Sequence, residues 1–227
     1  SNDTIAPHYV LTDFDNSLAM WLPMDWVDGS GNPFGLGVSA FKNGDANQTF
    51  AGKFGAGFAF DGNGDYLNIP NTNSLNINRE SFSASFWIKP NSVSGTQTIF
   101  EKKLREGDLL SPTVYGVRMF PSGILFADFT NNSGYGLGYQ ISPALSPGVW
   151  YHSVVTYNGS VVSGYLDGAL VGSSSIQFTG PLASNTTSLH IGANVAAANG
   201  FNGVLDELMI YNRVLSFSEI KSLFDAG

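Results

Sequence analysis

Several features common in proteins of this length are missing from the sequence. It contains no cysteine, which excludes disulfide bridges and a thiolate nucleophile. It has no run of about 18 apolar residues, so we expect no membrane insertion. Only 12% of its 227 residues are charged, with 10 Lys and Arg against 18 Asp and Glu. The net charge of −8 predicts no nucleic-acid partner, because phosphate backbones are bound by clustered Lys and Arg.

Histidine, the usual general base, is also scarce. The three histidines are His8, His152 and His190, and no two of them have the spacing of a paired metal-binding motif. His152 alternates with Trp150 and Val154, which is typical of a histidine inside a core rather than of a base. The sequence therefore gives no sign of nucleophilic or zinc-assisted catalysis.

The sequence does contain many short, alternating apolar segments separated by Gly, Asn and Asp. Strands spaced every 8 to 12 residues without a long helical pattern are typical of a β-sandwich or barrel. We expect residues 1–16 to be a leader or linker and residues 17–227 to form one all-β domain. The predicted strands are 17–23, 55–61, 64–69, 81–89, 97–103, 113–119, 124–129, 136–141, 149–157, 161–167, 169–175, 187–193 and 201–211.

One helix is predicted at the C-terminal end. Ser216 and Glu219 have the spacing of a capping box, and Leu215 and Ile220 are placed to form a hydrophobic staple across it. Ile220 also begins an apolar stripe that continues at residues 223–224. We expect this short helix to pack on an edge of the sandwich.

Five motifs, in this order along the chain, resemble the laminin-G-like, concanavalin A-like lectin/glucanase superfamily over residues 17–224. They are Trp21-Leu22-Pro23-Met24-Asp25, Phe60-Asp61-Gly62-Asn63-Gly64-Asp65-Tyr66-Leu67, Phe82 to Pro90, Trp150 to Val155, and the strand containing Asp206-Glu207. The resemblance implies a two-sheet antiparallel jelly-roll sandwich. Glucanases of this fold usually carry Glu-x-Asp-x-x-Glu on one strand, and this sequence lacks it. Because Asp206 and Glu207 are neighbours, they are expected to point to opposite faces of their strand.

The resemblance also implies a structural calcium ion. Calcium binds six to eight oxygen atoms from carboxylates, carbonyls and water. Such an ion would lie where the first turn, the second hairpin and the last strand meet. Alternatively, these side chains only cap turns. The candidate ligands are Asp25, Asp28, Asn32, Asp61, Asn63 and Asp206.

Two other segments have the composition of a sugar-binding surface, where aromatic rings stack on sugars and polar side chains hold the hydroxyl groups. Trp26 lies in a polar turn, and residues 128–139 combine Asn, Asp and Tyr with glycine. The second segment could instead be a glycine-rich hairpin with one core aromatic residue. The candidate ligand-binding residues are Trp26, Asp128, Asn131, Asn132, Tyr135 and Tyr139.

These observations favour a non-catalytic recognition or adhesion module, located outside the cell or on its surface as part of a larger secreted protein. A glycan or cell-surface polymer is the expected partner, with calcium as a structural cofactor. Two alternatives remain: a structural or assembly domain that binds protein neighbours, and a divergent polysaccharide hydrolase or lyase.

Overall fold

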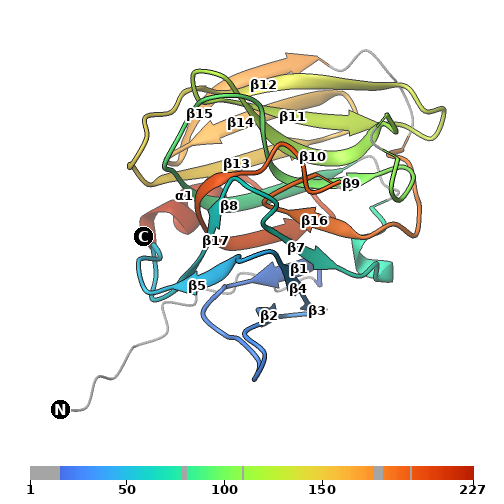
Figure 1. Ribbon diagram of the computed structural model, residues 1–227. Coiled ribbons are helices and arrows are strands. Elements are labelled where there is room, and N and C mark those ends of the chain that lie inside the picture. The colour runs from blue at the N-terminus through green and yellow to red at the C-terminus, as the bar shows by residue number, and fades with distance from the viewer. Residues whose placement is uncertain (1–15, 78–80, 109, 176–180, 195) are drawn as a thin grey trace.

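The computed structural model describes residues 16–77, 81–108, 110–175, 181–194 and 196–227. Nearly all of the predicted leader lies outside this range. Two large antiparallel sheets form a β-sandwich, with one short helix near the C-terminus (Figure 1). The all-β jelly-roll prediction is therefore confirmed.

The eight-stranded sheet has the order β15-β14-β13-β8-β17-β6-β5, and β1 pairs with β17 beside this path. Its strands are β1 (Leu18–Leu22), β5 (Asn47–Thr49), β6 (Gly57–Asp61), β8 (Phe82–Pro90), β13 (Tyr151–Tyr157), β14 (Val161–Leu166), β15 (Ala169–Ser175) and β17 (Asn202–Tyr211).

The seven-stranded sheet has the order β12-β11-β10-β9-β16-β7-β4. Its strands are β4 (Phe41–Asn43), β7 (Tyr66–Ile69), β9 (Gln97–Lys103), β10 (Thr113–Phe120), β11 (Ile124–Thr130), β12 (Gly136–Ala144) and β16 (Leu189–Ile191). A two-stranded hairpin, β2 (Phe34–Gly35) with β3 (Val38–Ser39), and a 3-10 turn, η1 (Asn73–Leu75), complete the loops.

The core lies between the two sheets and follows from the alternation of the strands. In β8, Phe82 and Phe86 face inward, as their alternation predicts. Phe86 meets Phe100 of β9 edge-to-face, with ring centroids 5.7 Å apart, and Phe82 meets Tyr115 of β10 at 5.1 Å. These aromatic pairs join the sheets across the core.

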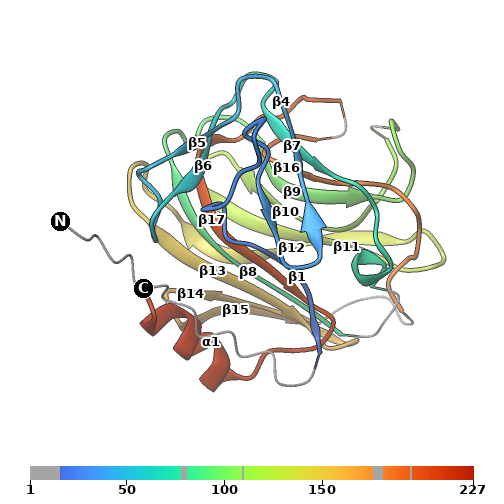
Figure 2. The same cartoon turned by 90° about the horizontal axis from the view of Figure 1, so that it is seen from below.

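The helix α1 (Phe217–Asp225) begins with the predicted capping box, in which Glu219 N–H donates to Ser216 Oγ and Glu219 accepts from Ser216 N–H. The expected position on a sandwich edge is wrong. Figure 2 shows α1 beneath the outer face of the eight-stranded sheet, where Phe224 stacks on Trp87 at 6.0 Å and on His152 at 6.2 Å. Trp87 is only 3% exposed as a result. The eight-stranded sheet is therefore covered on its outer side, at β8 and β13.

Candidate functional site: a groove on the seven-stranded sheet

The outer face of the seven-stranded sheet carries a groove of about 650 Å³ over β10, β11 and β12. Alternation along these strands places Val117, Ala127 and Phe129 in the core and Arg118 and Asp128 on the outer side. The groove is lined by Lys103, Leu110, Ser111, Pro112, Thr113, Arg118, Asp128, Phe129, Thr130, Gly134, Tyr135, Gly136, Leu137 and Gly138.

Glycines keep the floor of the groove low. Asp128 lies opposite Gly116 on one neighbouring strand and Gly138 on the other. A Cβ atom at Gly138 would lie 2.8 Å from Asp128 Oδ1, so any side chain there would displace the carboxylate. The two residues directly opposite Asp128 on the neighbouring strands therefore have no side chains to cover its carboxylate.

The charged centre of the groove is a two-point ion pair. Arg118 donates from Nε to Asp128 Oδ2 at 2.6 Å and from Nη2 to Asp128 Oδ1 at 2.7 Å. These hydrogen bonds raise the pKa of Arg118 further. Because guanidinium has five N–H groups, three remain without a partner among the described residues. The pair fixes a planar set of donors on the groove floor.

Tyr135 forms one wall and is 51% exposed. Its position depends on Asn131, whose Oδ1 accepts from Ser133 N at 3.0 Å and Tyr135 N at 3.1 Å, while Asn131 N donates to Tyr135 O at 3.0 Å. Gly134 adopts φ +76° in this turn. Leu110, 95% exposed, also lines the groove. The groove therefore combines an aromatic ring on a closely hydrogen-bonded turn with an exposed aliphatic side chain.

The other charged side chains near the groove each contact a different partner. Lys103 Nζ lies 3.7 Å from Glu101 Oε2. Glu106 accepts from Ser188 N at 2.8 Å and lies 3.8 Å from His190 Nε2. Asp128 is held by two hydrogen bonds from arginine, and Glu101 lies within ion-pair distance of a lysine.

The six predicted ligand-binding residues lie in four different places. Asp128 and Tyr135 line the groove. Asn131, which is 7% exposed, holds the turn that carries Tyr135, and the exposed Asn132 lies within that turn. Tyr139 points into the core and is 8% exposed, because it alternates with the outward-facing Gly138, so we do not include it in the site.

Trp26 lies elsewhere, packed on Trp21 of β1. Arg118 was not among the predicted residues, because only the register of β10 with β11 brings it to Asp128.

The predicted calcium ligands do not all meet at one place, although Asp25 lies near enough to Asp206 to raise its pKa. Asp28 accepts from Ser30 N and Asn32 N and closes its own turn. Asp206 Oδ2 accepts from Lys53 N at 2.8 Å and Phe54 N at 2.9 Å. Asp28 therefore closes its own turn, and Asp206 holds the loop that contains Lys53 and Phe54.

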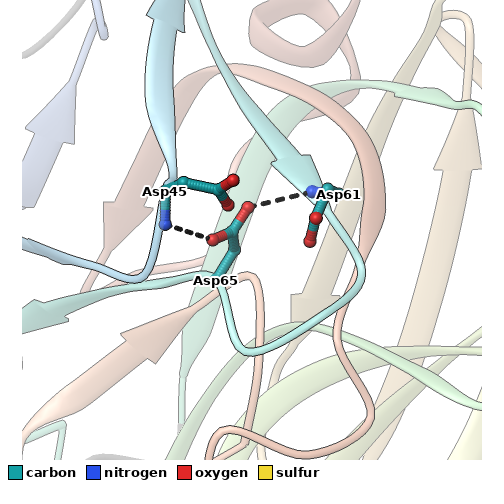
Figure 3. Close-up of side chains that lie close together, drawn as sticks. All are labelled: Asp45, Asp61 and Asp65. Carbon is teal, nitrogen blue, oxygen red and sulfur yellow. Dashed lines mark hydrogen bonds between the residues drawn. The ribbon is translucent and has the colours of Figure 1, made fainter.

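One predicted calcium ligand, Asp61, does belong to a carboxylate cluster. Asp45, Asp61 and Asp65 have ligand oxygens within 4.8 Å of one another (Figure 3). Asp65 is buried and accepts from Asp45 N at 2.8 Å and Asp61 N at 3.0 Å, whereas the other two are exposed. Burial raises the pKa of Asp65, and a hydrogen bond with the Asp45 side chain raises it further. The oxygen-only cluster fits the chemistry of calcium.

The expectation that Asp206 and Glu207 point to opposite faces is wrong. The register of β17 with β8 shifts between Asp206 and Met209, and Glu207 has φ +53°. Leu205 and Leu208, the residues before and after the bulge, both face the core, so Asp206 and Glu207 lie together on the other side of the strand. Burial, together with the charges of Glu207 and Asp25, raises the pKa of Asp206 to about 8. Since Asp206 is 0% and Glu207 8% exposed, this pair lies under the surface and not in a cleft.

The family model described as the concanavalin A-like lectin/glucanases superfamily, of the laminin G type, matches residues 61–221. The chain therefore belongs to this superfamily. No curated protein matches the sequence closely enough to count as a relative.

Solved structures share the fold at low identity. The binding domain of Paraclostridial Mosquitocidal Protein 1 is 18% identical with a TM-score of 0.73, and the match covers 92% of this chain and 52% of that one. Domain 4 of AbnA, a GH43 extracellular arabinanase from Geobacillus stearothermophilus, in complex with arabinotriose, is 20% identical with a TM-score of 0.66 and coverages of 91% and 98%. The binding domain of Botulinum Neurotoxin DC in complex with SialylT is 15% identical, with a TM-score of 0.68 and coverages of 93% and 52%.

The chain thus spans about half the length of the mosquitocidal and neurotoxin binding domains, and nearly all of the arabinanase domain. Within the described residues, no helix is long and apolar enough to cross a membrane.

Proposed function

We propose that this chain is a non-catalytic glycan-binding module of a larger extracellular or cell-surface protein. The observation that carries the proposal is the groove over β10–β12, where the Arg118–Asp128 pair presents fixed donors beside the half-exposed ring of Tyr135. Sugars need this combination, since their ring faces are apolar and their edges carry hydroxyl groups.

The charges of the groove favour a neutral glycan. Arg118 is balanced by Asp128 and Lys103 by Glu101, so no unbalanced cation is offered to an acidic sugar. The chain as a whole carries −8, which repels polyanions at moderate ionic strength.

Similar structures support a binding role and an extracellular setting. Two were determined with glycans, arabinotriose and SialylT, and the arabinanase is described as extracellular. At 20% identity or less, these structures indicate a shared fold but not a shared ligand. The neutral-glycan proposal therefore rests on the groove.

Binding to a panel of soluble neutral and acidic polysaccharides, measured by affinity electrophoresis, tests the proposal. Tyr135→Ala is expected to weaken binding about tenfold, which corresponds to about 1.4 kcal/mol. Asp128→Asn is expected to weaken it too, because the arginine loses its two-point partner. Phe217→Ala, which removes an exposed ring from α1, is the matched control and should bind like the wild type.

Each alternative gives a distinct result in the same experiments. Failure of the wild type to bind any polysaccharide would favour an assembly domain that binds protein neighbours. Release of new reducing ends from a polysaccharide would instead indicate a hydrolase, and lyase products would be detected by their ultraviolet absorbance.

We further propose that calcium, the expected structural cofactor, binds at Asp45, Asp61 and Asp65 and joins the segment before β5 to the β6–β7 hairpin. A ligand present at 100 times its dissociation constant stabilises the folded state by about 2.7 kcal/mol. Added calcium is therefore expected to raise the melting temperature and chelator to reverse the change. Asp61→Asn should abolish the shift, whereas Asp28→Asn, an exposed aspartate in another turn, should retain it. An identical melting temperature with calcium and with chelator would reject this site.

A further inference from the structure

A second exposed aromatic surface lies away from the groove, in the segment between β1 and β3. Trp26 and Phe34 are each 40% exposed, and their ring centroids are 6.1 Å apart with an interplanar angle of 31°. Phe34 N donates to Trp26 O at 3.1 Å, which fixes the two residues side by side. In Figure 1, β2 and β3 lie at the opposite end of the molecule from β11 and β12. We call Trp26 and Phe34 the aromatic platform.

The platform is supported from below by a buried indole. Trp21, 3% exposed, meets Trp26 edge-on with ring centroids 5.6 Å apart. Its Nε1 donates to Glu207 Oε2 at 2.6 Å, and Glu207 occupies the bulge of β17. The ring of Trp26 therefore rests on a side chain that is itself fixed to the sheet.

The backbone around the platform carries strain. Met24, two residues before Trp26, has φ +65°, and Glu207 has φ +53°. Left-handed backbone is costly for both residue types, which lack the short polar side chains that tolerate it. Gln48 Nε2 donates to Met24 O at 2.9 Å and Asp25 O at 2.8 Å and holds the Met24 conformation. Strain of this kind is retained where the surrounding structure fixes a functional geometry.

The size and charge of the platform select its occupant. Each ring has a surface area of about 150–250 Å², of which 40% is exposed. The exposed area of the two rings is therefore far smaller than the roughly 800 Å² that each partner buries in a stable protein interface. Exposed Asp28 follows two residues after Trp26, and hydrogen bonds from Asn32 and Ser30 lower its pKa. An apolar face of this size matches one or two sugar rings, and the net charge of −8 disfavours an acidic sugar.

We propose that the aromatic platform of Trp26 and Phe34 is a second binding site for neutral glycan, separate from the groove. The chain then contacts one polysaccharide at two distant points, or joins two polysaccharide chains. Two linked contacts strengthen binding to a long polymer more than to a short oligosaccharide. This inference goes beyond the proposed function, which requires only the groove.

The test measures binding to an insoluble neutral polysaccharide and to its short oligosaccharides, in the wild type and in Tyr135→Ala. Added to Tyr135→Ala, either Trp26→Ala or Phe34→Ala is expected to lower affinity for the polymer a further tenfold or more. Trp150→Ala is the matched control, since it removes a partly buried tryptophan covered by Lys89. Melting curves of all variants confirm that each is folded.

A second measurement reads the platform directly. Trp21 and Trp87 are buried, so collisional quenching by acrylamide reports mainly on Trp26 and Trp150. Oligosaccharide is expected to protect the wild type from quenching, to protect Trp150→Phe equally, and to leave Trp26→Phe unprotected.

The outcomes separate the two proposals. The platform proposal would be overturned if Trp26→Ala and Phe34→Ala bound the polysaccharide as tightly as the wild type. It would also be overturned if Trp150→Ala lost as much affinity as they do. Either result would leave the groove proposal intact. Loss of binding in Trp26→Ala with none in Tyr135→Ala would support the platform and reject the groove. Absence of binding by the wild type to every polymer would overturn both.

Discussion

Replacing Asp206 by asparagine is expected to make the protein more stable at pH 8 and to flatten its dependence on pH. The carboxyl of Asp206 is 0% exposed, and its Oδ1 has no hydrogen-bond partner among the described residues. Its pKa rises from 3.8 to about 8, mainly because of burial and partly because of the nearby carboxylates of Glu207 and Asp25. The charged form is therefore costly in the folded protein.

The sign follows from proton binding. Between pH 3.8 and about 8 the folded state holds a proton on Asp206 that the unfolded state has released. Stability therefore falls as pH rises through this window and is greatest below it. Each pKa unit corresponds to 1.36 kcal/mol, so the full effect is on the order of 5 kcal/mol.

Asparagine keeps the acceptor that holds the loop, because its Oδ1 can still receive the N–H groups of Lys53 and Phe54. Alanine cannot, and Asp206→Ala is expected to lose about 2 kcal/mol or more at every pH through two unpaired donors. The comparison separates the charge of Asp206 from its role as an acceptor.

Urea unfolding followed by tryptophan fluorescence at pH 4.5, 6 and 8 measures the effect. The difference between Asp206→Asn and the wild type removes contributions from other carboxylates, provided that they are unchanged. We expect this difference to grow in favour of asparagine as pH rises. A constant difference across the three pH values, or a variant less stable than the wild type at pH 8, would refute the reasoning.

Three further predictions concern the fold. Ser216→Ala removes the cap that accepts from Glu219 N and is expected to cost about 1 kcal/mol in urea unfolding, whereas Ser216→Asp should cost little. Gly164→Ala would place a methyl group against the backbone of Ile141; we expect a loss of several degrees in melting temperature, and an unchanged value would contradict the close packing of β14 on β12. Phe224→Ala uncovers Trp87 and is expected to increase acrylamide quenching of tryptophan fluorescence, with Phe217→Ala, which alters an exposed ring of the same helix, as the unaffected control.

Much of the fold could be predicted from local patterns. Alternation and turn residues located the longer strands, and β9 and β15 have the predicted bounds. The Asp167-Gly168 turn joins β14 to β15 with φ of +50° and +74°, the backbone that these residue types favour. By contrast, β2 to β5 contain only two or three residues each, too few for alternation to be detected.

The candidate site could be predicted only in part. Tyr135 and Asp128 have suitable side chains within one segment of the sequence, and both line the groove. Arg118 could not be found in this way, because its partner is ten residues away on another strand and register decides whether they meet. Tyr139 resembles Tyr135 in the sequence but lies in the core, since strand alternation sends it to the other face.

The sequence by itself determined the class of fold, the start of the helix and the absence of cysteine chemistry, because these depend on residue type and short-range spacing. Only the tertiary structure decided which polar groups share a surface. It paired Arg118 with Asp128, brought Asp45 to Asp61 and Asp65, and packed Trp26 against Trp21 rather than in the groove. Such contacts depend on strand register, a bulge and the packing of loops, which join residues distant in the chain and leave no local pattern to detect.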